Sequence, residues 1–335
     1  MIRTAILGAS GYVGGELLRL IAAHPQLKAT RLFGDSKAGL ALGAVHPHLA
    51  AAYPDAVVEK FDESALDEVD LVFAALPHGH SQRLAGTILG KGVPFVDLAA
   101  DFRLHDAATY ERWYGHPHEA PELLGSFIYG IPELHRDAIK GAKAVAAAGC
   151  YATAAILALK PLVDAGAVEP SSLIVDAASG VSGAGREAKE ATGFSTVDGS
   201  FSAYGLLNHR HTAEMEMAIE GTVLFTPHLV PMTRGILATC YGEATGAADP
   251  LQILRDAYAN EPFVHVTDQP PATKWVSASN GVQLTARYDE RTKRVVALSA
   301  IDNLGKGAAG QMIQCANLMH GLDETAGLTS IGVYP

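Results

Sequence analysis

The chain has little of several features that mark special classes of protein. Its three cysteines, Cys150, Cys240 and Cys315, are too few and too widely spaced for a disulfide framework, and no CxxC metal motif is present. Free thiols suit a reducing compartment. A net charge of −11 lacks the basic excess of a nucleic-acid binder. No signal-peptide pattern and no run of about eighteen apolar residues occurs. We therefore expect a cytoplasmic protein that binds neither nucleic acid nor membrane.

What is present is the composition of a globular enzyme: 335 residues, of which 48% are hydrophobic, enough for two domains. Short apolar segments alternate with helical ones in the first half, which predicts βαβ units and a parallel sheet. Longer, partly alternating segments follow in the second half, which predicts a mainly antiparallel sheet with a few helices. Strands are expected at 2–7, 30–33, 69–76, 93–98, 144–148, 172–178, 222–230, 236–243 and 294–301.

The fold class is therefore α/β, with a Rossmann-like dinucleotide-binding domain over 1–148 and an α+β catalytic and oligomerisation domain over 149–305. Residues 101–132 are polar and irregular and are expected to form long loops. A helix is expected from about residue 151, with Pro161 kinking or ending it. A last helix, near 307–322, is expected within the segment 306–335 that completes the first domain.

A glycine-rich turn, Gly-Ala-Ser-Gly-Tyr-Val-Gly at 8–14, joins the first strand to the first helix. Glycines there permit a tight bend and a close approach of the backbone to a pyrophosphate, whose charge the helix start stabilises. The spacing is GxxGxxG, which is less specific than GxGxxG. The residues predicted to bind a dinucleotide are Gly8, Ser10, Gly11, Tyr12, Val13 and Gly14.

The end of the second predicted strand bears on the choice of cofactor. Asp35 favours NAD, because an acidic residue there bonds the ribose hydroxyls. Ser36 and Lys37 favour NADP, because a hydroxyl and an ammonium group suit a 2′-phosphate. We predict NADP.

Cys150 is the candidate nucleophile. It follows Gly149 just where a helix is expected to begin, and helix N–H groups and the helix dipole stabilise a thiolate there. Cys240 and Cys315 lie inside an apolar strand and a helix, and are expected to be structural.

At this point the chain resembles the N-acetyl-gamma-glutamyl-phosphate reductase family of the semialdehyde dehydrogenase group. The matching stretches run through nearly the whole chain. They are GASGYVG (8–14), LPHGHS (76–81), DLAADFRL (97–104), YGIPEL (129–134), AGCYAT (148–153), SGVSGAG (179–185), NHRHTAE (208–214), PHLVPMTRG (227–235) and DNLGKGAAGQ (302–311).

The resemblance implies that Cys150 attacks the acyl phosphate and expels phosphate, and that the resulting thioester accepts a hydride from NADPH to give the semialdehyde. The acid/base is predicted to be His209, with His211 as the alternative if the helix has already begun. His211 and Glu214 are assigned to substrate contact or orientation. Arg103 and Arg234 are predicted to bind substrate, because guanidinium groups grip carboxylates and phosphates. Tyr204 is also predicted to contact substrate.

The stretch from Ser179 to Gly185 is too glycine-rich for a strand interior and is expected to form a loop. Further cofactor contacts are implied in this loop, after the strand that ends at 76 and near the last helix. They are Leu76, Pro77, His78, Ser179, Gly180, Gly183, Asn303 and Gly305. Histidine pairs at 46/48, 78/80 and 116/118 lack an accompanying Cys or carboxylate cluster, so no metal site is expected. A homodimer or homotetramer is expected, with one face of the second sheet buried.

Other functions compete with this hypothesis. Aminoadipyl-phosphate reduction in lysine biosynthesis differs by one methylene, but a carrier-bound substrate would call for a basic rim that the sequence lacks. The NHRHTAE and GCYAT stretches fit aspartate-semialdehyde dehydrogenase less well. A catalytically silent NADP-binding sensor would need neither Cys150 nor His209.

Overall fold

The computed structural model describes residues 1–246 and 248–334, which form two compact units. Residues 1–148 and 308–328 make up the first unit, and residues 149–307 with the segment from Thr329 onward make up the second. The prediction placed all of 306–335 in the first domain. The final segment lies instead in the second unit, because Asn280 N–H donates to the Thr329 carbonyl (2.7 Å) and Val333 N–H to that of Ser277 (2.9 Å).

The first unit is built on a six-stranded sheet in which every neighbouring pair is parallel, so the α/β prediction is confirmed. The strand order is β2-β1-β3-β4-β6-β5. β3 and β6 are wholly buried, as expected when both faces of a parallel sheet are covered. The strands are β1 (Ile2–Leu7), β2 (Leu27–Phe33), β3 (Leu71–Ala74), β4 (Phe95–Asp97), β5 (Ile128–Gly130) and β6 (Ala144–Ala147).

The order of these strands locates a ligand crevice. β1 lies between β2 and β3: β2 is added on one side of β1, and β3 and β4 are added on the other side. The order of the strands therefore reverses between β1 and β3. Ligands of open α/β sheets bind at such a point, outside the carboxyl ends of the strands. The segments that leave those ends are the glycine-rich turn after β1 and residues 75–78 after β3.

The helices of the first unit include one from the far end of the sequence. α10 packs against α1, α5 and β4 and supplies Met312 and Ile313 to the core. It follows a π-helical turn over Gly305–Ala309 and ends at Met319, so the predicted last helix is shorter than expected. The helices are α1 (Tyr12–Ala22), α2 (Leu42–Val45), α3 (Ser81–Gly90), α4 (Ala107–Tyr114), α5 (Pro132–Ile139) and α10 (Gly310–Met319). α4 and β5 replace part of the long loops expected over 101–132.

The second unit contains a seven-stranded sheet, in the order β11-β12-β13-β10-β7-β9-β8. Its pairs are antiparallel apart from β7–β9 and β11–β12, which confirms the mainly antiparallel prediction. β8, β11 and β12 were not predicted. The strands are β7 (Leu173–Gly180), β8 (Ser202–Ala203), β9 (Val223–Val230), β10 (Ile236–Glu243), β11 (Val264–Val266), β12 (Val282–Asp289) and β13 (Arg294–Ile301).

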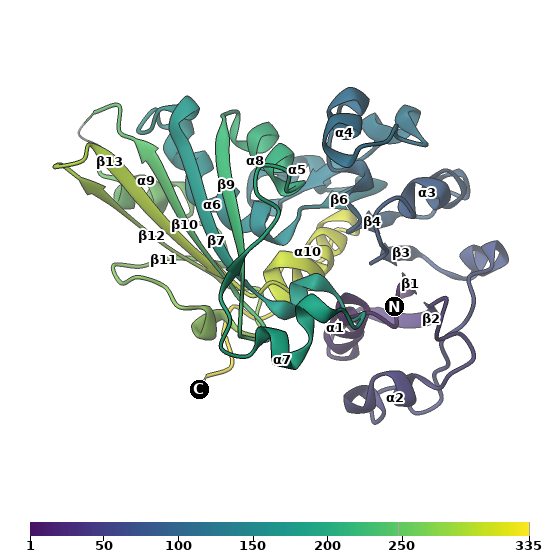
Figure 1. Cartoon of the computed structure of the whole chain (residues 1–335). Helices are drawn as coiled ribbons and strands as arrows, with labels where there is room; N and C mark the ends of the chain where they lie inside the picture. Colours follow the sequence, from purple (N-terminus) through teal and green to yellow (C-terminus); the bar gives the residue numbers. More distant parts are fainter. Residues whose placement is uncertain (247, 335) are drawn as a thin grey trace. The chain divides into compact units, whose positions relative to one another are not determined.

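One face of this sheet is covered by α6 (Cys150–Asp164), with α8 (His211–Ile219) and α9 (Pro250–Ala257) packed beside it (Figure 1). α6 continues through Pro161, which therefore neither ends nor visibly interrupts it. A short helix, α7 (Phe194–Val197), lies in the segment before β8.

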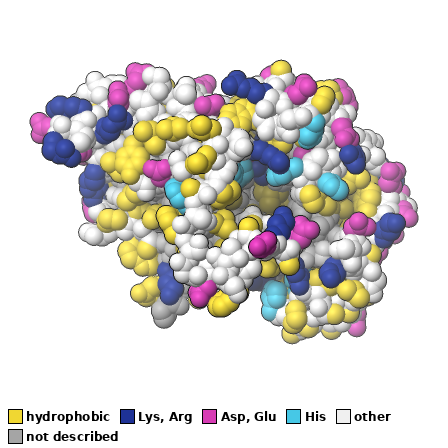
Figure 2. Space-filling model, in the orientation of Figure 1, with side chains coloured by type: hydrophobic (Ala, Val, Ile, Leu, Met, Phe, Trp, Pro, Cys, Tyr) yellow, Lys and Arg dark blue, Asp and Glu magenta, His cyan; other side chains and the backbone are white. Residues whose placement is uncertain are grey.

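The opposite face of the sheet is only partly covered. Burial alternates along β7, where Val175 is buried and Ile174 is half-buried, and Leu224 on β9 is 50% exposed. Hydrophobic side chains are visible over this unit in the space-filling view (Figure 2). In the described part of the chain, no helix is long and apolar enough to cross a membrane.

Candidate active site

The glycine-rich turn is packed so tightly that two of its positions admit only glycine. Gly8 has φ +84°, and a Cβ there would lie 2.3 Å from the Ala75 carbonyl oxygen, beyond β3. A Cβ on Gly14 would lie 2.3 Å from the Gly8 oxygen. α1 begins at Tyr12, and its N-cap residue, Gly11, has no side chain with which to cap the first turn. The backbone N–H groups at this helix start can therefore hold an anion such as a pyrophosphate, so the turn fits a dinucleotide.

The other predicted cofactor residues of the first unit follow β2 and β3. Ser36 and Lys37 are exposed just after β2. Leu76 is half-buried, whereas Pro77 and His78 are exposed. His78 is held in place, since its Nδ1 accepts a hydrogen bond from Ala100 N–H at 3.1 Å. All five lie at the carboxyl edge of the sheet, where the crevice is expected.

Arg103 lies in the same unit and is only 3% exposed, with Nη2 donating to the Leu98 carbonyl. Beside it is a buried carboxyl group that sequence reasoning missed. Asp97 is fully buried, accepts from Ser81 Oγ at 2.6 Å, and has no hydrogen-bond partner for Oδ2 among the described residues. Burial raises the pKa of Asp97 to about 8, so the protonated form dominates at neutral pH.

In the second unit, Cys150 is the first residue of α6. Its predecessor, Gly149, has an extended backbone and no side chain that could cap the helix. The first N–H groups of α6 therefore belong to the same helical turn as the thiol. The Cys150 side chain is half-buried, whereas Cys240 and Cys315 are completely buried. Burial raises the pKa of the Cys240 thiol, which is consistent with a structural role. Cys150 thus combines access with a thiolate-favouring position.

Three of the predicted site residues, His209, His211 and Tyr204, lie around Tyr151. The rings of His209 and His211 lie 5.6 Å and 5.9 Å from that of Tyr151, and 4.8 Å from each other. Tyr204 donates its hydroxyl to the Tyr151 hydroxyl at 3.1 Å. Burial lowers the pKa of His209 to about 4. Tyr151 is a residue that sequence reasoning missed, although its place next to Cys150 was a signal.

Glu214 ties the start of α8 to the start of α6. It is fully buried, and its Oε2 accepts a hydrogen bond from Gly149 N–H at 2.9 Å. Its Oε1 lies 3.8 Å from Nε2 of His211, the first residue of α8. Two roles were predicted for Glu214, substrate contact and orientation. Complete burial between these partners argues against substrate contact and favours orientation.

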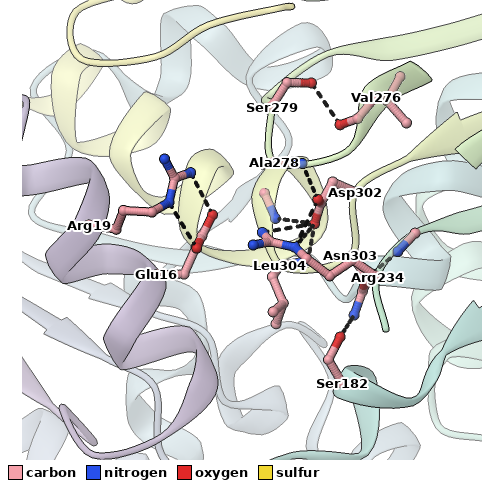
Figure 3. A network of polar contacts seen from close by, with 12 residues as sticks. Glu16, Arg19, Ser182, Arg234, Val276, Ala278, Ser279, Asp302, Asn303 and Leu304 are labelled. Atoms are coloured by element: carbon pink, nitrogen blue, oxygen red, sulfur yellow. Dashed lines mark hydrogen bonds and ion pairs between the residues drawn. The ribbon is translucent and has the colours of Figure 1, made fainter. Parts of the chain in front are cut away.

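Arg234 is paired with a buried carboxylate. Its Nε lies 3.0 Å from Oδ2 of Asp302, which is fully buried and also accepts from Ala278, Leu304 and Gly305 N–H groups (Figure 3). The Arg234 side chain is 21% exposed. The structure thus gives the guanidinium a structural partner in addition to any ligand it binds.

Three predicted cofactor residues near this ion pair are engaged within the protein. Asn303 is 2% exposed, accepts from Gly235 N–H at 2.7 Å and donates to Ser182 Oγ at 2.9 Å. A Cβ on Gly305 would lie 2.1 Å from the Ser279 carbonyl oxygen. A Cβ on Gly180 would lie 2.8 Å from the backbone of 233–234. The glycines therefore serve backbone packing at these points.

The glycine-rich stretch from Ser179 was predicted to be a loop, and part of that prediction is wrong. Ser179 and Gly180 are the last residues of β7, where they pair with β9 and β10. Gly183 follows in a 3₁₀ turn, and its Cβ position lies 3.6 Å from Nδ2 of Asn303. Among the described residues, no group of three or more His, Cys, Asp or Glu side chains is placed to hold a metal ion.

Two family models match the chain and divide it at the same point as the fold. Residues 3–142 match the model described as the NAD-binding domain of semialdehyde dehydrogenase. Residues 150–303 match the model described as the semialdehyde dehydrogenase dimerisation domain. The chain is thus of the semialdehyde dehydrogenase class.

Similar curated proteins narrow this class. A protein from Desulforudis audaxviator is 46% identical, and one from Symbiobacterium thermophilum is 47% identical; both alignments cover 100% of this chain and 100% and 99% of the relatives. Both are named N-acetyl-gamma-glutamyl-phosphate reductase. The chain therefore belongs to the N-acetyl-gamma-glutamyl-phosphate reductase family.

Solved structures share the fold at low sequence identity. Aspartate semialdehyde dehydrogenase II from Vibrio cholerae, complexed with ASA, has a TM-score of 0.72 at 18% identity, over 96% of this chain and 98% of that one. The enzyme from Candida albicans, crystallised with NADP, has a TM-score of 0.72 at 16% identity and the same coverage.

Proposed function

We propose that the chain reduces N-acetyl-gamma-glutamyl phosphate to N-acetylglutamate 5-semialdehyde in arginine biosynthesis, with NADPH as reductant and phosphate as the second product. The observation that carries this proposal is the half-buried Cys150 at the start of α6, next to Tyr151, around which His209 and His211 gather. Full-length relatives at 46% and 47% identity, named for this reaction, support it.

The first chemical step requires a base. His209 is the proposed base: burial lowers its pKa to about 4, so its imidazole is neutral near pH 7, and it takes the Cys150 proton once Nδ1 gives up the hydrogen bond that it accepts from His211 N–H (3.2 Å). The thiolate then forms a bond to the acyl carbon, and the bond from that carbon to the phosphate oxygen breaks. The proton on His209 passes to the departing phosphate, which leaves a thioester on Cys150. The His211 ring, oriented by Glu214, lies beside the ring of His209.

The second step reduces the thioester. When bound, NADPH supplies the hydride for this reduction. The N–H groups at the start of α6 stabilise negative charge that develops on the substrate oxygen. As the carbonyl re-forms, the carbon–sulfur bond breaks, which releases the semialdehyde and regenerates the Cys150 thiolate. The helix start again stabilises that thiolate.

Substrate and cofactor contacts complete the proposal. Tyr204 and His211 are 37% and 15% exposed, which leaves both within reach of a substrate. Arg103 and Arg234 are proposed to bind its carboxylate and phosphate groups. For the cofactor, we propose that the glycine-rich turn, Leu76, Pro77 and His78 bind it. Five residues that are also held by contacts within the protein are proposed to bind near its nicotinamide: Ser179, Gly180, Gly183, Asn303 and Gly305.

NADP is preferred over NAD in this proposal because of Ser36 and Lys37. Both are exposed just after β2, where an ammonium group can pair with a 2′-phosphate. Lys37→Ala should raise KM for NADPH about tenfold while KM for NADH stays within twofold, since only NADPH carries that phosphate. An unchanged ratio of the two kcat/KM values would remove Lys37 from the cofactor site.

The decisive assay runs the reaction in reverse with N-acetylglutamate semialdehyde, phosphate and NADP. NADPH formation that depends on phosphate is expected, and its absence would overturn the proposal. Cys150→Ser should abolish it, whereas Cys240→Ala should keep kcat within about twofold because that thiol is fully buried away from the chemistry. Full activity of Cys150→Ser would rule out the covalent mechanism.

We further propose that the protein is a cytoplasmic homodimer or homotetramer. The partly exposed apolar face of the second sheet, with Leu224 50% exposed, supports self-association, as does the match to a dimerisation domain. Sedimentation equilibrium of the unchanged chain and of Leu224→Lys tests this point, since a charge on the face should weaken association.

A further inference from the structure

We propose that His46 is a positioning residue for the dinucleotide, acting through the carbonyl group of Ala9 in the glycine-rich turn. The inference rests on the proposed function, because it takes NADPH as the ligand of that turn. His46 is only 5% exposed, and its Nε2 lies 2.9 Å from the Ala9 oxygen. A carbonyl oxygen can only accept, so Nε2 carries a hydrogen and donates it.

The backbone of His46 is fixed on both sides. It ends α2, where its N–H donates to the Leu42 carbonyl at 2.7 Å. It also begins the next 3₁₀ turn, where its carbonyl accepts from Leu49 N–H at 2.9 Å. Pro47 follows and disfavours a helical conformation at His46, which has φ −128° and ψ 81°. The position of the imidazole is therefore set by a backbone that cannot easily move.

The imidazole fills a space that α1 leaves for it. A Cβ added to Gly15 would lie 2.7 Å from Cε1 of His46, closer than real Cβ contacts. Ala9 itself is completely buried, whereas Ser10 and Gly11 are half-buried. His46 thus holds the turn from its buried side, opposite the side that a ligand can reach.

The geometry of the peptide bond gives this contact its function. In a trans peptide the C=O and the following N–H point in opposite directions. Because His46 fixes the Ala9 carbonyl toward the interior, the N–H of Ser10 is aimed away from it, toward the open side of the turn. Aimed N–H groups are what a pyrophosphate binds. Loss of the hydrogen bond frees this peptide to rotate, which should weaken cofactor binding without touching the thiol chemistry.

The test compares His46→Gln with His46→Leu in the full-length chain. A Gln side-chain amide can occupy the place of Nε2 and donate to Ala9, whereas Leu fills the space without a donor. NADPH affinity is measured directly by quenching of protein fluorescence, and KM for NADPH is measured beside kcat. We expect His46→Leu to raise Kd and KM for NADPH about tenfold, with kcat at saturating NADPH within twofold. His46→Gln should recover most of the affinity.

His265→Leu is the matched control, because His265 is exposed on β11 of the second unit. It should bind NADPH as the unchanged chain does. Unchanged affinity in a folded His46→Leu variant overturns the proposal, and so does equal affinity of the Gln and Leu variants. If the Leu variant does not fold, His46→Asn replaces it, since its shorter amide cannot reach Ala9. Failure of the unchanged chain to bind NADPH would instead overturn the proposed function on which this role rests.

Discussion

Gly307 lies directly against Cys150. A Cβ added to Gly307 would come within 2.8 Å of the Cys150 Cβ and 3.3 Å of its Cα. Real Cβ atoms do not approach so closely, and the Cys150 backbone belongs to a helix start that cannot easily give way. The residue that bears the nucleophile is therefore seated in a space that only glycine at 307 leaves open.

Gly307→Ala should accordingly displace Cys150. A misplacement of about 1 Å at a reacting group typically costs on the order of 100-fold in rate, so we expect kcat to fall by about that factor. The measurement is kcat together with the rate of Cys150 alkylation by iodoacetamide. Gly90→Ala is the control, because nothing lies within 4 Å of its Cβ position. Normal kcat in Gly307→Ala would mean that the contact relaxes at no cost to catalysis.

Glu214 provides a second prediction, which separates stability from catalysis. Glu214→Ala leaves the Gly149 N–H without its acceptor, so the free energy of unfolding should fall by about 1–3 kcal/mol. Glu214→Gln keeps an acceptor oxygen but loses the charge facing His211, so it should be nearly as stable as the unchanged chain yet have lower kcat.

Urea unfolding and steady-state kinetics are measured on both Glu214 variants. Glu290→Ala, at an exposed position, controls for loss of a carboxylate and should leave both quantities unchanged. If Glu214→Gln matched the unchanged chain in kcat, the carboxylate would serve only the backbone of Gly149 and would not orient His211.

Local patterns explain which parts of the fold could be predicted. β1 was predicted with its observed bounds because an apolar run meets a glycine turn at Gly8. α4 was missed in a polar stretch, although its ends carry the usual signals: Asp106 accepts from Thr109 N–H, and Gly115 has φ +79°. β5 has three residues and depends on pairing with β6, which local sequence does not encode.

The candidate site shows the same division. Cys150 could be found because a strand, a glycine and a helix start are adjacent in sequence. The contact between Glu214 and Gly149 joins residues 65 positions apart, so no local pattern predicts it. The partner of Arg234 was equally hidden, since Asp302 is 68 positions away. Residues were thus identified by type and motif, whereas their partners required the tertiary structure.

The buried carboxyl group of Asp97 should lower the free energy of unfolding as the pH rises. Burial raises its pKa to about 8 from an ordinary 3.8, so the folded chain keeps a proton that the unfolded chain releases. Stability from this group is complete below pH 4 and is lost as the pH rises toward 8, by up to about 1.4 kcal/mol per pH unit. Asp97→Asn stays neutral and should lack this loss, which makes it the more stable protein at pH 8.

Urea unfolding at pH 5, 6.5 and 8 measures the effect. The difference in unfolding free energy between Asp97→Asn and the unchanged chain should grow with pH across this range. Asp55→Asn is the control, because Asp55 is exposed and its substitution should not change the slope. Parallel stability curves for Asp97→Asn and the unchanged chain would mean that the buried carboxyl ionises as freely as one in solvent.

The buried imidazole of His209 should have the opposite effect: the free energy of unfolding should fall as the pH is lowered. Burial among aromatic rings lowers its pKa to about 4 from 6.5, so the unfolded chain gains a proton between these values that the folded chain does not. Stability from this group is present above pH 6.5 and is lost as the pH falls toward 4, by up to about 1.4 kcal/mol per pH unit. His209→Gln should flatten this part of the stability curve, and His265→Gln, at an exposed strand position, should not.

The same low pKa keeps the proposed base neutral, so protonation of His209 should not reduce kcat/KM until the pH falls below about 5. An acid limb centred at 6.5 that disappears in His211→Asn would transfer the role of base to His211.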